Sequence, residues 1–268
     1  LLVNDYKDIP NNCAHNKRSN SLIFSPVHSE LLPVELADGS VELVPIVADI
    51  IAAQLCEIVL ALGSIGPSEA KWFGIWIEWD KHTKLLRDDK VVIKEMGRYN
   101  GSRCFLKARV LCPQNTLSAR TVFLFYCEAV SLVLRGAYNI PDYHVVKFAS
   151  LQLLALVATP PSVEVVTSVL GEVLPISILS RRQAKRWSVD LIHAHSAWVT
   201  AIGSKPESVH RTYLAELEKY DWYGTVELWH AEVTCSCASN QWEAKVGITV
   251  SGIVVHTTIV GEEQVWMS

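Results

Sequence analysis

The 268-residue sequence lacks any run of about 18 uncharged apolar residues, the length that a membrane-spanning helix needs. Its two most apolar stretches contain Glu57 and Glu128, and each is short enough to be a buried helix. An excess of basic charge is missing too, because 24 basic residues oppose 28 acidic ones and leave a net charge of −4. The sequence therefore predicts neither a transmembrane helix nor a chain whose overall charge attracts nucleic acid.

The motifs of common enzymes are also missing. The sequence has no Gly-x-Ser-x-Gly elbow, no loop ending in Gly-Lys-Ser/Thr and no His-Glu-x-x-His. His193 and His195 lie two apart on a predicted helix and point about 200° apart, so they do not share a metal. Cys235-x-Cys237 lies on a predicted strand without two further ligands nearby, which argues against zinc. We predict no enzymatic activity, no cofactor and no metal.

Cysteine occurs seven times but never as a Cys-x-x-Cys pair. Scattered thiols in odd number are typical of free, buried cysteines in a reducing compartment, so we expect a cytoplasmic protein. Tryptophan is frequent, with nine residues. Trp72, Trp76 and Trp79 lie in one predicted strand region, where core packing is the main interpretation and an exposed aromatic docking face the alternative.

The pattern along the chain changes twice. Residues 1–32 are polar and aperiodic and predict a linker or tail. In 33–115, apolar runs on both sides of Asp38-Gly39 predict a β-hairpin, and Asp49 is expected to cap a helix that ends at Leu62. An aromatic strand over 71–79 follows, and 85–93 predicts a turn and another short strand. This set of elements suggests a ubiquitin-like β-grasp lobe.

Residues 116–224 have the spacing of helices. Ser118 is expected to cap a helix that stops at Gly136, and Pro141-Asp142 opens a second one. Helices near 162–170 and 182–199 follow, and Ser204 to Glu207 predicts a capping box that begins a helix through Leu217. Residues 225–268 then contain four β-rich runs. The predicted fold class is a multi-lobe α+β chain: a β-grasp, a helical bundle and an antiparallel sheet.

The order of these pieces, and the short sequences at their joints, resemble a FERM domain. The matching sequences are, in chain order, VELADGSVELVPI, KWFGIWI, FYCEAVSLVLRGAYNI, VVKFASLQLLALV, LPISILSRRQAKRW and PESVHRTYLAELEKYDWYGTVELWHAEV. A FERM domain has a ubiquitin-like lobe, a helical lobe similar to acyl-CoA-binding protein and a third lobe of pleckstrin-homology or phosphotyrosine-binding type. The resemblance implies these lobes at 33–115, 116–224 and 225–268, the last as an incomplete pleckstrin-like sheet. The helical part is similar to myosin-tail and talin FERM domains.

Two local clusters of basic residues stand out against the acidic net charge. From Arg87 to Arg120, eight basic residues oppose three acidic ones, a local balance of +5. A second cluster contains no acidic residue. Such clusters suit anionic lipid headgroups, and the alternative is a solvated face paired with acids from elsewhere in the fold. The predicted lipid-binding residues are Lys94, Arg98, Arg103, Lys107, Arg181, Arg182, Lys185 and Arg186.

The resemblance implies a function as well as a fold. It implies a non-catalytic adaptor that links the cytoplasmic tails of membrane proteins and phosphoinositides or other acidic lipids to cytoskeletal proteins. Such a module lies in the cytoplasm, peripheral at the plasma membrane or the cytoskeleton, and does not bind nucleic acid. Two alternatives remain: a FERM region that regulates an attached kinase or phosphatase, and the cargo-binding tail of a motor protein.

Overall fold

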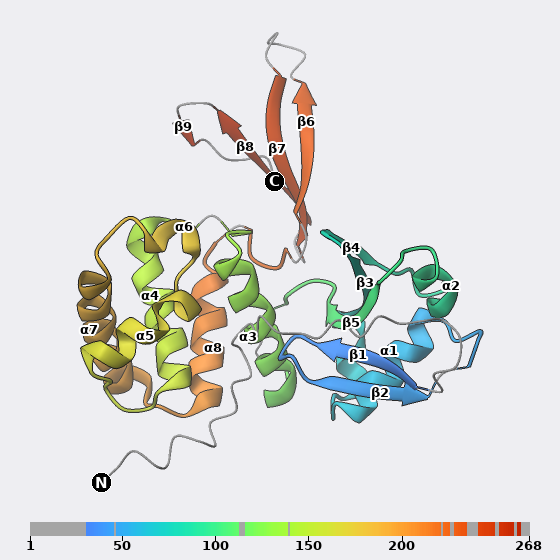
Figure 1. The fold of residues 1–268 in the computed structure, drawn as a ribbon, viewed down its shortest axis with the longest axis horizontal. Helices are drawn as coiled ribbons and strands as arrows, with labels where there is room; N and C mark the ends of the chain where they lie inside the picture. Colours follow the sequence, from blue (N-terminus) through green and yellow to red (C-terminus); the bar gives the residue numbers. More distant parts are fainter. Residues whose placement is uncertain are drawn as a thin grey trace.

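The computed structural model describes residues 31–45, 47–112, 116–138, 140–220, 222–225, 228–234, 241–249, 252–259 and 262–263. They form a sheet lobe, a helical lobe and a terminal sheet, in that order along the chain (Figure 1). Helix α3 is the part of the helical lobe that lies next to the sheet lobe, and the terminal sheet projects beside both lobes. The mixed helix and strand architecture expected from the sequence is therefore confirmed at this level.

The sheet lobe contains five strands in the order β2-β1-β5-β3-β4. Their bounds are β1 Leu31–Leu36, β2 Val41–Pro45, β3 Phe73–Trp79, β4 His82–Leu85 and β5 Arg103–Ala108. Neighbouring strands are antiparallel except β1 and β5, which run parallel. The predicted hairpin is present, because β1 and β2 are joined through Gly39 at a φ of 79°, a conformation that glycine adopts without strain.

Helix α1 (Ala52–Leu62) packs against this sheet, but it begins later than predicted. Asp49 lies in a turn and does not cap it; the N-cap is Ile51, whose N–H donates to Gln54 Oε1 at 3.2 Å. The buried face of α1 includes Cys56 and Leu60, whereas Ile58 and Leu62 are 37% and 50% exposed.

A second correction concerns residues 85–93. The predicted short strand is absent there, because Val92–Met96 form helix α2 and the strand that pairs with β3 lies earlier, at His82–Leu85. Val92 is fully buried, so the apolar run packs into the core from a helix. A short 3₁₀ helix, Pro67–Trp72, precedes β3. Short apolar runs do not distinguish a buried helix from a strand by their pattern alone.

The helical lobe follows the predicted boundaries more closely. Its helices are α3 Ala119–Leu134, α4 Asp142–Leu156, α5 Val163–Val173, α6 Ile176–Leu179, α7 Ala184–Ile202 and α8 Pro206–Leu217. Ser118 caps α3 as predicted, by accepting a hydrogen bond from Thr121 N, and Gly136 ends that region at a φ of 69°. Ser204 does not cap α8, because the N-cap is Lys205 and makes no side-chain capping bond.

Helix α4 is the centre of the helical lobe. It packs against α5, α7 and α8, and α3 packs against α8 on the side toward the sheet lobe. Phe148 on α4 and Tyr213 on α8 are buried with their rings 5.3 Å apart in an edge-to-face arrangement. Aromatic pairs of this geometry add about 0.5–1.5 kcal/mol beyond the area they bury.

The terminal sheet has the antiparallel order β6-β7-β8-β9. Its strands are β6 Leu228–Thr234, β7 Gln241–Thr249, β8 Gly252–Ile259 and β9 Glu262–Glu263. The first three predicted β runs form strands, whereas the fourth run, 263–267, overlaps β9 only at Glu263 and otherwise lies outside the described residues. Ile248 and Ile253 lie opposite each other on β7 and β8 and are 53% and 62% exposed. This cross-strand pair leaves an apolar spot at the end of the β7–β8 hairpin.

Candidate functional site

Two of the predicted lipid-binding residues lie on β5 and are held by carboxylates of the same sheet. Arg103 donates to Glu78 at 2.8 Å and to Glu35 at 3.4 Å. Lys107 lies 3.5 Å from Glu78, and only 16% of its side chain is exposed. Glu35 and Glu78 come from β1 and β3, which flank β5, so the pairing follows from the strand order and not from proximity in sequence. These two cations are already compensated.

The other two residues of the first cluster lie at α2. Arg98 donates to Glu95 at 2.6 Å, and Lys84 approaches the same carboxylate at 3.2 Å. Burial raises the pKa of Glu95, but the hydrogen bond and charge of Lys84 and the charge of Arg98 outweigh it, so the pKa is lowered. Within the described part of the chain, Lys94 is exposed and makes no ion pair. Of the four predicted residues, Lys94 therefore remains the uncompensated cation.

Three of the four remaining cations of the Arg87–Arg120 segment are paired too. Arg87 binds Asp89 at 2.9 Å, Arg109 forms an ion pair with Asp88, and Arg120 donates to Asp38 at 2.7 Å; Lys90 has no such contact in the described structure. Asp88, Asp89 and Glu95 are already counted in the local balance of +5, whereas the fold adds the carboxylates of Glu35, Glu78 and Asp38 and reduces it to +2.

The second cluster is arranged differently. Arg181, Arg182, Lys185 and Arg186 are all exposed around the start of α7. Arg182 lies 3.4 Å from Asp190, with its guanidinium 4.7 Å from the centre of the Trp187 ring. Lys185 and Arg186 make no ion pair with any described residue. The structure therefore gathers four exposed cations around the start of α7, and among the described residues Lys185 and Arg186 are the two of them without an ion pair or a hydrogen bond.

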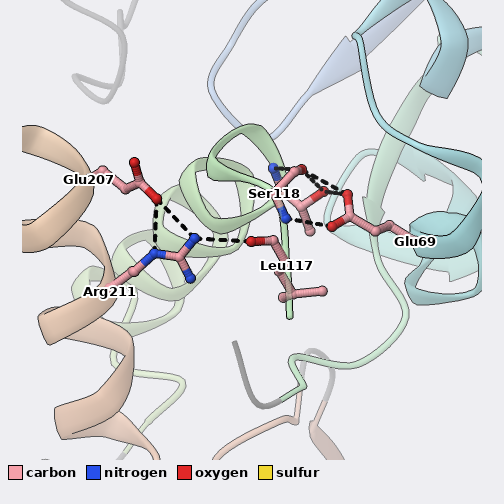
Figure 2. A network of polar contacts seen from close by, with 6 residues as sticks. Glu69, Leu117, Ser118, Glu207 and Arg211 are labelled. Carbon is pink, nitrogen blue, oxygen red and sulfur yellow. Dashed lines mark hydrogen bonds and ion pairs between the residues drawn. The ribbon is translucent and has the colours of Figure 1, made fainter. Parts of the chain in front are cut away.

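A polar joint between the sheet lobe and the helical lobe was not predicted (Figure 2). Glu69, from the turn before β3, accepts hydrogen bonds from Ser118 N at 2.5 Å, Ser118 Oγ at 2.8 Å and Thr121 Oγ1 at 2.5 Å. Arg211 on α8 donates to Leu117 O at 3.0 Å, so both flanking lobes hold the residues before α3. Burial raises the pKa of Glu69, but these hydrogen bonds outweigh it and lower the pKa overall.

Two further contacts complete this joint. Arg120 on α3 donates to Asp38 in the β1–β2 turn, where Ser40 also donates to the same carboxylate at 2.6 Å. Phe73 on β3 and Phe125 on α3 are buried, with ring centres 5.5 Å apart. A capped helix end, an ion pair and an aromatic pair thus fix α3 against the sheet lobe.

The link to the terminal sheet is made by main chain and aromatic rings. Leu111 N donates to Gly224 O at 3.0 Å, and Tyr223 OH donates to Cys112 O at 3.3 Å. Trp222 and Tyr223 are 5% and 8% exposed, so both side chains are buried at this link. Trp76 is also buried, and Trp79 stacks on Tyr99 with ring centres 3.9 Å apart. Packing is therefore the role of these tryptophans.

The residues that the structure describes give no support to a metal site. No group of three His, Cys, Asp or Glu side chains there is placed to hold a metal. His195 is buried with Nε2 2.7 Å from Val157 O, whereas His193 is exposed. Cys235 and Cys237 lie outside the described residues. The described cysteines, namely Cys56, Cys104, Cys112 and Cys127, are free and buried, as predicted.

Burial also accounts for the chemistry of these thiols. It raises the pKa of Cys56 and of Cys112 to about 11 and that of Cys104 to about 12, so the unreactive thiol persists at neutral pH.

Among the described helices, none combines the length and the apolar character required to cross a membrane.

The comparisons with known proteins agree with this architecture. Residues 113–226 match the family model of the FERM central domain, so the predicted resemblance to FERM domains is confirmed. FERM domain-containing protein B of Dictyostelium discoideum is 25% identical over 184 residues, which cover 66% of this chain and 37% of that relative. The chain thus spans well under half the length of that relative.

Solved structures extend the likeness beyond the helical lobe. The Dictyostelium discoideum myosin VII MyTH4-FERM MF2 domain superposes with a TM-score of 0.73 at 15% identity, covering 89% of this chain and 50% of that one. The FERM and C-terminal domain complex of Drosophila Merlin gives 0.66 at 16% identity, covering 85% and 75%. Human myosin 7b, solved with the harmonin-a PDZ3 domain, gives 0.66 at 11% identity, covering 84% and 49%. At these identities the likeness establishes the fold.

Proposed function

We propose that this chain is a non-catalytic FERM adaptor that joins membrane proteins and acidic phospholipids to the cytoskeleton. In this proposal residues 33–115 are the ubiquitin-like lobe, to which β1 adds Leu31 and Leu32, residues 116–224 the helical lobe and 225–268 part of a pleckstrin-like lobe. FERM domains are in general non-catalytic interaction modules. The module would act in the cytoplasm, at the plasma membrane or on the cytoskeleton, with protein tails and acidic lipids as its partners.

The observation that carries the lipid part is the exposed cluster at α7. Lys185 and Arg186 have no carboxylate partner among the described residues, whereas Arg98, Arg103 and Lys107 each have one. A cation near an anionic membrane surface contributes about 1 kcal/mol, but a cation already paired with a carboxylate gains less. We therefore assign lipid contact first to Lys185 and Arg186, with Lys94 as a secondary contact.

Vesicle co-sedimentation tests this assignment. Vesicles of phosphatidylcholine with phosphatidylinositol 4,5-bisphosphate should bind the protein at low salt and release it at high salt, because ions screen charges over about 8 Å at physiological ionic strength. Changing Lys185 and Arg186 to Gln should weaken binding by about 30-fold, from about 1 kcal/mol for each cation. The matched control changes Arg103 and Lys107 to Gln and should weaken binding far less. Equal loss in both variants would contradict the assignment.

The motor-tail alternative has a specific observation in its favour. Several structural neighbours are MyTH4-FERM regions of myosins, and the myosin 7b structure includes a PDZ domain as its partner. In this reading the chain would bind a cargo protein on behalf of an attached motor. A full-length sequence would decide between the adaptor and the motor tail, because a motor domain or a kinase domain would be visible in it.

A further inference from the structure

The outer face of the β1–β2 hairpin, which points away from the buried core, is apolar and exposed. Side chains alternate between the two faces of a strand, and the register of the hairpin places Leu31, Val41 and Leu43 together on this face. Their side chains are 41%, 51% and 56% exposed, whereas Val34 and Val44 on the opposite face are fully buried. Within the described structure, the hairpin therefore leaves an apolar strip uncovered.

The strand β2 is also an edge strand, because it pairs with β1 alone in the order β2-β1-β5-β3-β4 (Figure 1). Leu36 N donates to Ser40 O at 2.8 Å at the turn, and hydrogen-bonded pairs alternate from there along an antiparallel ladder. The N–H and C=O groups of Val41 and Leu43 therefore point away from β1, toward the open edge. Pro33 lies opposite Leu43 and has no N–H, in agreement with this alternation. The exposed main chain of β2 can accordingly pair with a further strand.

The charge around this edge is acidic. Residues 31–70 contain six acidic residues and no lysine, arginine or histidine. Glu42, on β2, and Asp49, in the turn that follows, make no ion pair with any described residue, in contrast to Glu35, which Arg103 binds. A strand added to β2 would place one of its side chains opposite Glu42, and a basic residue at that position gains a cross-strand ion pair.

We propose that the open edge of β2 is a docking site for an extended segment of another protein in which apolar and basic residues alternate. The apolar side chains lie beside Val41 and Leu43 on the exposed face, and a basic side chain lies beside Glu42 on the other face. Main-chain hydrogen bonds give strand addition its affinity, and the alternate side chains give it specificity. A second copy of this chain fits less well, because pairing β2 with β2 brings two acidic strands together. The site is independent of the lipid contact assigned to Lys185 and Arg186, so either can fail alone.

Fluorescence anisotropy with labelled peptides tests the proposal. The probe KVKVKVK has the required alternation, EVEVEVE reverses its charge, and KKVVVKK keeps its composition without the alternation. KVKVKVK should bind at least tenfold more tightly than either control, because it alone places valines on the apolar face and lysines beside Glu42. In an antiparallel ladder the valine N–H groups of the probe face β2, so backbone N-methylation of the valines should abolish binding and that of the lysines should not. No binding of KVKVKVK at millimolar concentration, or equal binding of both N-methylated peptides, would overturn the proposal.

Two variants of β2 locate the site. Leu43→Pro removes an outward N–H that the ladder with β1 does not use, a change that edge strands tolerate, and it should abolish binding of KVKVKVK. Glu42→Lys should weaken KVKVKVK and strengthen EVEVEVE, because it reverses the charge that the probe meets. Ile176→Thr, at an apolar residue of α6 that is 77% exposed, is the matched control and should change neither peptide. Thermal unfolding shows whether each variant stays folded, and Leu43→Pro should bind phosphoinositide vesicles like the wild type.

Two further outcomes would contradict this docking site. Binding of KVKVKVK that survives both Leu43→Pro and Glu42→Lys would place the peptide elsewhere and overturn the proposal. Self-association of the protein that Leu43→Pro abolishes, measured by sedimentation equilibrium, would assign the open edge to a second copy of the chain and overturn it as well.

Discussion

The carboxylate of Glu69 caps helix α3 across a lobe boundary, by accepting a hydrogen bond of 2.5 Å from the backbone N–H of Ser118. The N–H groups at the start of a helix have no acceptor inside the helix. Here Glu69, 49 positions away in sequence, supplies the acceptor for one of them. The same carboxylate accepts from Thr121 Oγ1, so one buried side chain ties the start of α3 to the sheet lobe.

Replacing Glu69 with Gln should reduce the free energy of unfolding by about 1.5–3 kcal/mol, the usual worth of a hydrogen bond to a charged group. Urea denaturation at pH 7 measures it. Glu172→Gln on the exposed face of α5 is the matched control and should change little. A loss no greater than in the control would show that the joint adds nothing to stability.

Glu69 also predicts a dependence on pH. Its pKa in the folded protein is below the ordinary value of 4.5, so its contribution is complete above that value and is lost as the pH falls through the folded pKa. The difference in stability between wild type and Glu69→Gln should therefore shrink as urea titrations move from pH 6 to pH 3. A difference that stays constant over this range would contradict the lowered pKa.

Gly224 should not tolerate a side chain. Its φ is 97°, and a Cβ placed there would lie 2.9 Å from the carbonyl oxygen of Leu111, which belongs to the segment leading out of the sheet lobe. Gly101 has a φ of 69° and nothing within 4 Å of such a Cβ, so Gly101→Ala should cost only the backbone strain of about 1 kcal/mol. Thermal unfolding should show a clearly larger loss for Gly224→Ala. Equal losses would mean that the main chain yields at this contact.

His210 should make the protein sensitive to mild acid. Burial lowers its pKa to about 4, and its ring lies 4.4 Å from Tyr126 and 5.1 Å from Phe123. Because the folded pKa lies below the unfolded value near 6.5, the stability it supports is present above pH 6.5 and declines toward pH 4, by up to about 1.4 kcal/mol per pH unit. His210→Gln should flatten this decline between pH 7 and 5. The exposed His193→Gln is the control and should leave it unchanged.

We expect the opposite dependence of stability on pH for Glu128. This carboxyl on α3 is 5% exposed, and burial raises its pKa even though Lys107 and Arg135 lower it. A raised folded pKa means that the stability it supports is present at low pH and is lost as the pH rises through that value. Glu128→Gln should therefore raise the melting temperature more at pH 8 than at pH 5. A larger gain at pH 5 would show that the carboxylate is stabilised by its basic neighbours.

Local signals in the sequence predicted the helical lobe well. Ser118 precedes the start of α3 and Gly136 follows its end, as expected, because a capping hydroxyl and a glycine of positive φ act within one turn of the helix they delimit. Asp49 and Ser204 carry the same kind of signal, yet Ile51 and Lys205 occupy the cap positions. Ile51 is held extended by its bridge with Val91, and Pro206 occupies the first turn of α8, so these contacts and residues define the two helix starts.

Contacts between distant residues could not be predicted in the same way. Arg103 was expected at a lipid surface, but its partner Glu35 is 68 residues away and reaches it only because β1 lies beside β5. The capping of α3 by Glu69 depends on the same kind of long-range placement. A local count of charges therefore could not show which cations have carboxylate partners from distant strands of the sheet.

The parallel pairing of β1 with β5 also delays completion of the sheet while the ribosome synthesises the chain. The first described strand of the sheet lies between its second and its fifth, so β1 waits for Arg103–Ala108 before its ladder with β5 can form. At about 5–20 residues per second, a ribosome needs roughly 4–14 s to add that stretch. During this interval the β1–β2 hairpin emerges with one edge open. A nascent chain arrested before Arg103 should therefore recruit chaperones, and one extended beyond Ala108 and clear of the exit tunnel should release them.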